Sequence, residues 1–326
     1  MAVPTNTVQT YTQKNIREDL ENTIYNVDPT KTPLFTMAKK LKAEQTYHEW
    51  NVDILTAQNT SNAQIQGDDA TADSTNATGR MGNYTQISRK VVQIADTLQS
   101  VRAAGGSNKM GYQLLRSSKA LKRDIEGSIT KNAAQSAGSS SAAAVTGGLP
   151  SFLVTNVQFQ TGGANPTGLV TVGSETFGNG TTARTAGTTP VAFTEAQFDT
   201  AVEEVYTSSG DSPDYVLCSP VNKQIISKFT GVGTRFTQVE DKTLKTAIDV
   251  IQSDFGEVKI VPDIFLAQSH DVYFVKSDMV RIAYLRPFKT VPLAKTGDSE
   301  KKMLVVEYAL EVGNEHALGA VFDTTG

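Results

Sequence analysis

The sequence is poor in the residues on which metal sites and redox chemistry depend. Its 326 residues include one cysteine, Cys218, and three histidines, His48, His270 and His316. A single cysteine excludes a disulfide within the chain, which fits a compartment without disulfide chemistry. The histidines are far apart, and none has a second ligand at metal-binding spacing. We therefore expect no metal and no cofactor.

Long apolar runs are also missing. No stretch approaches the roughly 18 apolar residues of a membrane-spanning helix, and residues 1–12 lack the apolar core of a secretory signal. We expect a soluble chain that is made in the cytoplasm and has no membrane partner. A net charge of −4 argues against a basic nucleic-acid binder, and 39% hydrophobic residues support a sizeable core in two or three lobes.

No catalytic constellation can be assembled from the sequence. The pair Asp68-Asp69 has no base near it, and Gly231-Val232-Gly233 lacks the further glycine and lysine of a phosphate-binding loop. No Gly-x-Ser-x-Gly elbow occurs. Cys218 precedes a predicted helix that could activate it, but a buried, inert thiol is the stronger interpretation. The sequence thus predicts no enzyme.

One long amphipathic helix is predicted over residues 107–135. Its apolar positions recur with the 3.6-residue period of a helix with one buried face: Met110, Leu114, Leu121, Ile125 and Ile129. The opposite side carries six bases against two acids, Asp124 and Glu126. This side is interpreted either as a solvated face or as a surface for an anionic partner.

Two predicted strands enclose a long polar segment. Residues 46–55 alternate as a half-buried strand, and residues 84–98 form a second strand with a bulge between Val91 and Val92. Residues 56–83 between them have only Ile65 and Met81 as large apolar side chains, which favours a projecting hairpin over a disordered loop. The first 45 residues are better interpreted as an extended arm than as a domain.

The second half of the sequence predicts a compact α+β lobe and a returning sheet. Residues 155–192 are rich in Gly and Thr and are interpreted as a flexible surface insertion, although short strands such as 169–172 are compatible with the pattern. From residue 193 the pattern is helix, strand, helix and further strands. The chain closes with strands predicted at 280–285, 303–312 and 317–322.

An arm, a projecting hairpin, a long helix and a separate lobe leave surfaces that a monomer does not pair, as in a self-assembling shell subunit. Blocks spread over nearly the whole chain resemble a family of tailed-phage major capsid proteins. The blocks are 15–25 (NIREDLENTIY), 28–33 (DPTKTP), 46–50 (TYHEW), 222–227 (NKQIIS), 253–259 (SDFGEVK), 283–289 (AYLRPFK) and 311–317 (EVGNEHA).

This family is similar to the Hong Kong 97 phage shell fold, so the resemblance implies an α+β capsid fold. It implies an N-terminal arm (1–45), an extended loop (46–98, tip 56–83), a Gly/Thr-rich insertion (155–192) and an axial domain (193–280). The peripheral domain would comprise 99–154 with the spine helix, together with 281–326. The implied function is a structural subunit that forms the hexamers and pentamers of an icosahedral head around double-stranded DNA.

The implied partners are further copies of the chain, a portal, scaffolding or decoration proteins, and packaged DNA bound without sequence specificity. The implied location is the virion, with assembly in the host cytoplasm. The candidate assembly contacts are apolar residues of the arm and hairpin: Ile16, Leu20, Ile24, Phe35, Ile65 and Met81. The candidate DNA-facing bases lie in the arm and on the helix: Lys14, Arg17, Lys31, Lys39, Lys40, Lys109, Arg116, Lys119 and Arg123.

Two alternative functions remain open from the sequence. The same fold builds protein-filled nanocompartments of the encapsulin type, which differ by lacking packaged DNA. A phage tail or adhesin protein would also contain Gly/Thr-rich strands, but it would form fibres or trimers.

Overall fold

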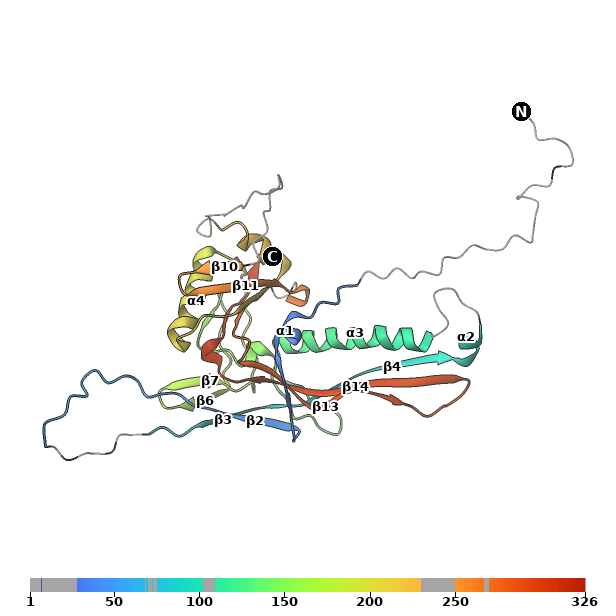
Figure 1. Ribbon diagram of the computed structural model, residues 1–326, viewed down its shortest axis with the longest axis horizontal. Coiled ribbons are helices and arrows are strands. Elements are labelled where there is room, and N and C mark those ends of the chain that lie inside the picture. The colour runs from blue at the N-terminus through green and yellow to red at the C-terminus, as the bar shows by residue number, and fades with distance from the viewer. Residues whose placement is uncertain are drawn as a thin grey trace.

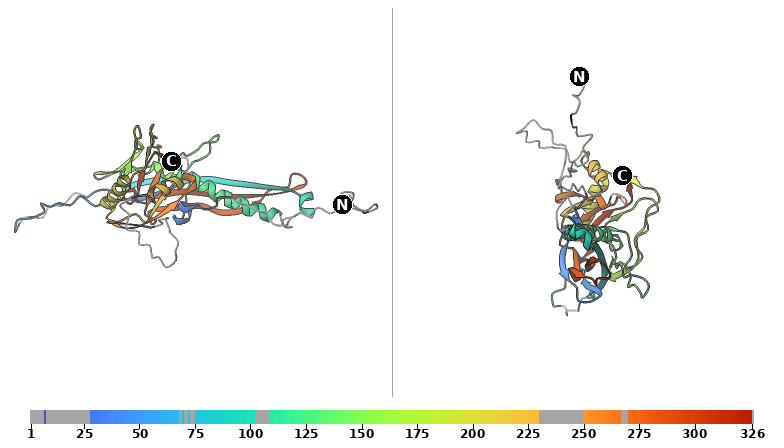
Figure 2. Two further views of the ribbon diagram at one scale, coloured as in Figure 1. Left: turned by 90° about the horizontal axis from the view of Figure 1, so that it is seen from above. Right: turned by 90° about the vertical axis from the view of Figure 1, so that its right-hand side faces the viewer.

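The computed structural model describes residues 7, 28–67, 69, 72, 75–101, 109–229, 250–266 and 270–325. The molecule is elongated (Figures 1 and 2). A long helix lies on a flat sheet and forms a platform on one side, a rounded α+β lobe stands beside it, and a hairpin projects beyond the lobe in the opposite direction.

The platform is α3 (Lys109–Thr130) packed on a four-stranded sheet of order β1-β13-β14-β4. Its strands are β1 (Lys39–Lys42), β13 (Val280–Pro292), β14 (Ser299–Val312) and β4 (Gln86–Ala95), and α2 (Asp96–Ser100) follows β4. The predicted amphipathic pattern is confirmed, since Leu121, Ile125 and Ile129 are fully buried. The helix ends before residue 135, because the Asn132 side chain bonds the Arg184 backbone and turns the chain away.

The hairpin has a regular antiparallel stem. β2 (Tyr47–Val52) pairs with β3 (Gly79–Tyr84) in a register that sets Tyr47 opposite Tyr84 and Val52 opposite Gly79. The described residues of the 53–78 loop are in neither helix nor strand. The strand alternation predicted for 46–55 is confirmed. β3, however, lies in the segment that was assigned to the loop, because its few large side chains hide its periodicity.

The lobe is built on a six-stranded sheet of order β10-β11-β9-β12-β15-β5. Its strands are β10 (Val250–Ser253), β11 (Gly256–Pro262), β9 (Tyr215–Cys218), β12 (Val272–Val275), β15 (Gly319–Val321) and β5 (Val157–Gln158). The helices are α4 (Glu195–Ser209) and α5 (Pro220–Ile226), with the short turns η2 (Ile264–Leu266) and η3 (Glu315–Ala317). Thr194 and Gln197 form a capping box at the start of α4, and Gly210 ends the helix in the left-handed conformation (φ 75°).

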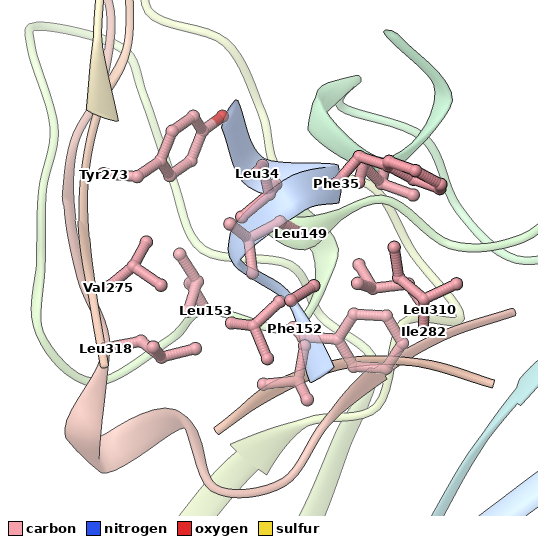
Figure 3. Packing of buried hydrophobic residues seen from close by; sticks show 14 of the residues in the cluster. Leu34, Phe35, Leu149, Phe152, Leu153, Tyr273, Val275, Ile282, Leu310 and Leu318 are labelled. Atoms are coloured by element: carbon pink, nitrogen blue, oxygen red, sulfur yellow. The ribbon is translucent and has the colours of Figure 1, made fainter. Parts of the chain in front are cut away.

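The main core joins the parts of the molecule. Leu34 and Phe35 of α1 (Pro33–Met37) pack with Leu149 and Phe152 of the η1 turn (Leu149–Ser151) and its C-cap, and with residues of β12, β13 and β14 (Figure 3). A second cluster fills the lobe between its sheet and α4. The end of the arm is therefore an integral part of the fold.

Several sequence-based expectations are wrong. The insertion 155–192 is folded: β6 (Leu169–Val172) pairs with β7 (Glu175–Gly178), β8 (Val191–Ala192) pairs with β16 (Thr324–Thr325), and Phe177 is fully buried. β4 has no bulge, because its register with β14 is continuous from 86 to 95. β15 lies in the lobe sheet, so the chain end belongs with the lobe and not with the platform, because β12 offers it an antiparallel partner.

Candidate assembly surfaces

The hairpin leaves the body from a network of buried polar contacts. The His48 Nε2 lies 2.7 Å from the Glu311 carboxylate, which also accepts a hydrogen bond from Arg281 at 3.0 Å. Thr85 donates to Glu307 at 3.0 Å, and Asn83 donates to the Leu310 carbonyl at 2.8 Å. These contacts attach the stem to one face of β14, on the side away from α3.

Glu311 is ionised at this junction. Burial opposes its ionisation, but the hydrogen bonds and charges of His48 and Arg281 outweigh burial and lower the pKa of Glu311. His48 lies beside Trp50, at 6.0 Å between ring centroids, and it also serves as the polar attachment of the stem.

The hairpin loop is acidic and exposes two apolar side chains. Residues 53–78 contain four aspartates and no lysine or arginine. Leu55 is 95% exposed and Ile65 is 79% exposed. An exposed apolar side chain on a projecting acidic loop has no partner in its own chain, which is typical of a surface that another molecule covers.

The platform sheet has an exposed face that complements this loop. We call it the outer face; it is the side of β13, β14 and β4 away from α3. Ile87 and Val91 are 54% and 51% exposed there, and Met303 and Val291 lie in register beside Val91. The same face carries three bases without an acidic partner among the described residues: Arg89, Lys289 and Lys301.

The direction of the Val91 side chain explains why the predicted bulge is wrong. The sequence places Val91 and Val92 side by side, and two neighbouring apolar residues were interpreted as a slip in strand parity. In the fold Val92 packs towards α3 with Ile94 and Met110, while Val91 points to the outer face. Both faces of this strand carry apolar side chains, which indicates that both are covered in the functional state.

The basic side of α3 forms a shallow groove. Arg116, Lys119 and Arg123 line a groove of about 320 Å³ together with Asp28 and Thr30 of the arm. Arg123 also lies over the Phe265 ring at 5.8 Å, and on the same helix Asp124 is paired with Lys90 at 2.6 Å. The predicted DNA-facing bases Arg116 and Lys119 are thus exposed and adjacent, whereas Lys109 is half-buried.

Of the remaining predicted site residues, some are buried, some are exposed and some lie outside the described chain. Phe35 and Met81 are buried in the chain's own core, so their side chains are not available as assembly contacts. Lys31 is exposed, Lys39 pairs with Asp278 at 2.6 Å, and Lys40 lies over the Phe35 ring. Five predicted residues lie outside the described part of the chain: Lys14, Ile16, Arg17, Leu20 and Ile24.

Sequence reasoning missed several buried charged groups, because each looks like an ordinary surface residue in the linear pattern. Glu126 was counted on the exposed side of the helix, but it is fully buried. Arg184 was expected in a flexible insertion, yet it is paired internally with Asp323 at 2.9 Å and Asp271 at 3.2 Å. Glu315 accepts hydrogen bonds from the backbone of Val154 and Thr155.

Among the described residues we find neither a metal-ligand cluster nor a reactive cysteine. No group of three or more His, Cys, Asp or Glu side chains among them is arranged to hold a metal ion. Cys218 is buried, and burial raises the pKa of its thiol to about 12, so the thiolate is scarce at neutral pH. None of the helices in the described ranges has the length and apolar character needed to cross a bilayer.

Comparison with known proteins identifies the family of the chain. The model of the SU10 major capsid protein family matches residues 3–325, nearly the whole chain. The chain belongs to that family. The capsid protein is also 28% identical to the major capsid protein of Escherichia phage Phieco32 over 364 aligned residues, which cover 100% of this chain and 99% of the relative.

Solved structures with the same fold are shells. The capsid of a native GTA particle matches with a TM-score of 0.62 at 13% identity, covering 97% of this chain and 98% of the other. The capsid of cyanophage P-SCSP1u matches with a TM-score of 0.60 at 11% identity, covering 99% and 97%. An encapsulin complex from Synechococcus elongatus matches with a TM-score of 0.54 at 10% identity, covering 94% and 92%. The capsid protein therefore has the Hong Kong 97 type of fold, and the α+β capsid architecture expected from the sequence is confirmed.

Proposed function

We propose that this capsid protein closes its shell by laying the acidic hairpin loop of one subunit on the outer face of the next. The observation that carries the proposal is the match between two exposed surfaces. The loop has four aspartates and exposed Leu55 and Ile65. The outer face has exposed Ile87 and Val91 beside Arg89, Lys289 and Lys301.

The position of the stem supports this arrangement. In its own subunit, the stem already covers the part of the outer face that contains Glu307 and Glu311. It does so through hydrogen bonds of His48 with Glu311 and of Thr85 with Glu307. The loop continues in that layer beyond the lobe (Figure 1). A second copy placed ahead of it presents the uncovered half of the same face at the same level. Such a head-to-tail contact closes into rings when the rotation between copies is suitable.

Hexamers and pentamers are the rings that we propose, and their repetition makes the shell cooperative. Each loop contact is worth a few kcal/mol at most, but every subunit in a closed ring gives one and receives one. We further propose that the shell is built in the host cytoplasm around double-stranded DNA, with a portal and with scaffolding or decoration proteins as additional partners. The basic groove of α3 supports nonspecific contact with phosphate.

Charge reversal with rescue tests the proposed loop contact. The double variant Arg89→Glu/Lys289→Glu is expected to lower the yield of closed shells about tenfold, because like charges then meet across the contact. Adding Asp68→Lys and Asp69→Lys is expected to restore assembly. The yield is measured by sedimentation and negative-stain electron microscopy, with circular dichroism to verify folding.

Lys122→Glu/Lys228→Glu is the matched control, since both lysines are exposed and neither lies on the outer face. Equal loss in the control, or no rescue by the aspartate reversals, would contradict the proposed contact. Packaged DNA in purified shells separates a phage head from an encapsulin-type compartment, and rods or isolated trimers would indicate the tail or adhesin alternative.

A further inference from the structure

One buried side chain of the spine helix holds the end of the arm. Glu126 of α3 has no exposed surface. Its Oε1 accepts a hydrogen bond from the Leu34 backbone N–H at 2.8 Å, and its Oε2 accepts one from the Phe35 N–H at 2.7 Å. These donors need a partner, because Thr32 provides no side-chain cap to this short helix. Glu126 thus ties α1 to α3.

A second buried carboxyl faces Glu126 from the lobe. Asp263 lies at the end of β11, just before η2, and it also has no exposed surface. Its Oδ1 accepts a hydrogen bond from the Phe265 N–H at 2.9 Å, and its backbone N–H donates to the Cys218 carbonyl. Its Oδ2 is buried, and no donor among the described residues reaches it. Across the contact between α3 and η2 it faces the Glu126 carboxyl, and its charge helps to raise the pKa of Glu126.

No base neutralises this pair in the part of the chain that is described. α1 has the sequence PLFTM and brings no charge. On α3 the nearby bases are Arg123, whose guanidinium lies over the Phe265 ring, and Lys131, which lines a cavity with Ile264 and Phe265. In the lobe, Lys223 donates to the Ile260 carbonyl. Two carboxyl groups in contact, without a cation, can form a hydrogen bond only when one of them carries a proton.

We propose that Glu126 and Asp263 share one proton, and that this proton is a latch between the spine helix and the lobe. The latch deepens the proposed shell function, because it joins the arm, the spine and the lobe of one subunit at a single point. α3 and η2 are in contact here, so the latch controls the angle of the lobe on the platform.

The two contacts of Glu126 respond differently to loss of the proton. An ionised Glu126 is still an acceptor, and a stronger one, for the Leu34 and Phe35 N–H groups. The same charge repels Asp263. Deprotonation therefore leaves the arm attached to the spine and weakens the contact between α3 and the lobe at η2.

The direction of the pH effect follows from the surroundings. Burial, followed by the charge of Asp263, raises the pKa of Glu126 to about 8, and burial also raises the pKa of Asp263. A raised pKa in the folded state means that the stabilisation is complete at acidic pH and declines as the pH rises towards that value. The latch is closed in mildly acidic and neutral solution and opens above about pH 8.

Hydrogen–deuterium exchange of the full-length wild-type subunit tests the latch. After correction for the intrinsic pH dependence of exchange, protection of the amides at 264–266 is expected to fall about tenfold or more from pH 6 to pH 9. Protection of Leu34 and Phe35 is expected to remain, because their acceptor persists. Unchanged protection at 264–266, or equal loss at Leu34 and Phe35, would overturn the proposal.

Asp263→Asn is the matched variant. Its amide retains an oxygen for the Phe265 N–H and offers Glu126 a permanent N–H donor, so the pH response at 264–266 is expected to disappear. A response equal to that of wild type would overturn the shared proton. Glu315→Gln is the control, because this buried carboxyl bonds the backbone of Val154 and Thr155 and not η2, so the response is expected to remain. Shell formation by the wild type, followed by microscopy, reports on the proposed assembly independently of the latch.

Discussion

At the scale of single residues, Arg184 is a buried charge that pairs with two acids. Its side chain is 3% exposed, it contacts Asp271 and Asp323, and it lies 4.1 Å from the Phe322 ring centroid. Burial raises the pKa of Asp271, while the Arg184 charge opposes that rise. Removing the arginine would leave two buried carboxylates without a counter-charge.

Arg184→Met is therefore expected to lower the free energy of unfolding by about 3–5 kcal/mol at pH 7. The loss is expected to be smaller at pH 4, because a carboxyl with a raised pKa is destabilising when ionised and is neutral at low pH. Urea unfolding at the two pH values measures the effect. Arg80→Met, which removes an exposed ion pair with Glu49, is the control and is expected to change little. A larger loss at pH 4 than at pH 7 would contradict the assignment.

At the scale of elements, the folded insertion supports the hairpin stem. Gly79 of β3 lies directly against β6: a Cβ at this position would be 2.3 Å from Cγ2 of Val172 and 3.1 Å from Cγ2 of Val52. Glycine is required here for close approach, and β6 in turn fixes the level at which the hairpin leaves the body.

Gly79→Ala is expected to destabilise the subunit by about 1–3 kcal/mol through this overlap. Val172→Ala removes the overlapping methyl groups, so the double variant is expected to be more stable than the sum of the two single losses predicts. Thermal unfolding of the four proteins in the cycle measures the coupling. If the changes in the free energy of unfolding were simply additive, the steric contact between β3 and β6 would be contradicted.

The helices and strands also show which parts of the fold could be predicted from the sequence. Periodicity identified α3 and α4, because each buries one face and leaves the other in water, and it identified β14 by its alternating large apolar residues, although residues 304–312 are buried on both faces. It failed for the insertion, because large apolar residues are sparse in this Gly/Thr-rich segment and the burial of Phe177 depends on distant parts of the chain. It also failed for Glu126, whose carboxylate binds backbone N–H groups 91 and 92 residues away. Contacts of this kind leave no local pattern.

At the scale of the whole molecule, each side of the platform sheet carries its own group of basic residues. The α3 side carries the groove of Arg116, Lys119 and Arg123, whereas the outer face carries Arg89, Lys289 and Lys301. If the outer face binds the neighbouring subunit, as we propose, the α3 side remains available for DNA.

Arg116→Glu/Lys119→Glu is expected to weaken DNA retention by shells and to reduce its dependence on salt, because each lost phosphate contact lowers the slope of log affinity against log salt by about 0.9. DNA release from purified shells across a salt series measures this effect. Lys228→Glu/Lys259→Glu on the lobe is the control, since both residues are exposed there. Unchanged retention and unchanged salt response in the groove variant would contradict the assignment.

The order of strands in the platform has a consequence for biosynthesis. β1 and β4 are made early, yet they meet only through β13 and β14, which end at residue 312 of 326. A polypeptide still being translated therefore has neither the sheet nor its outer face, because the two middle strands are not yet available. Ribosomal products that stop short of this hairpin therefore lack the surface that we propose for assembly.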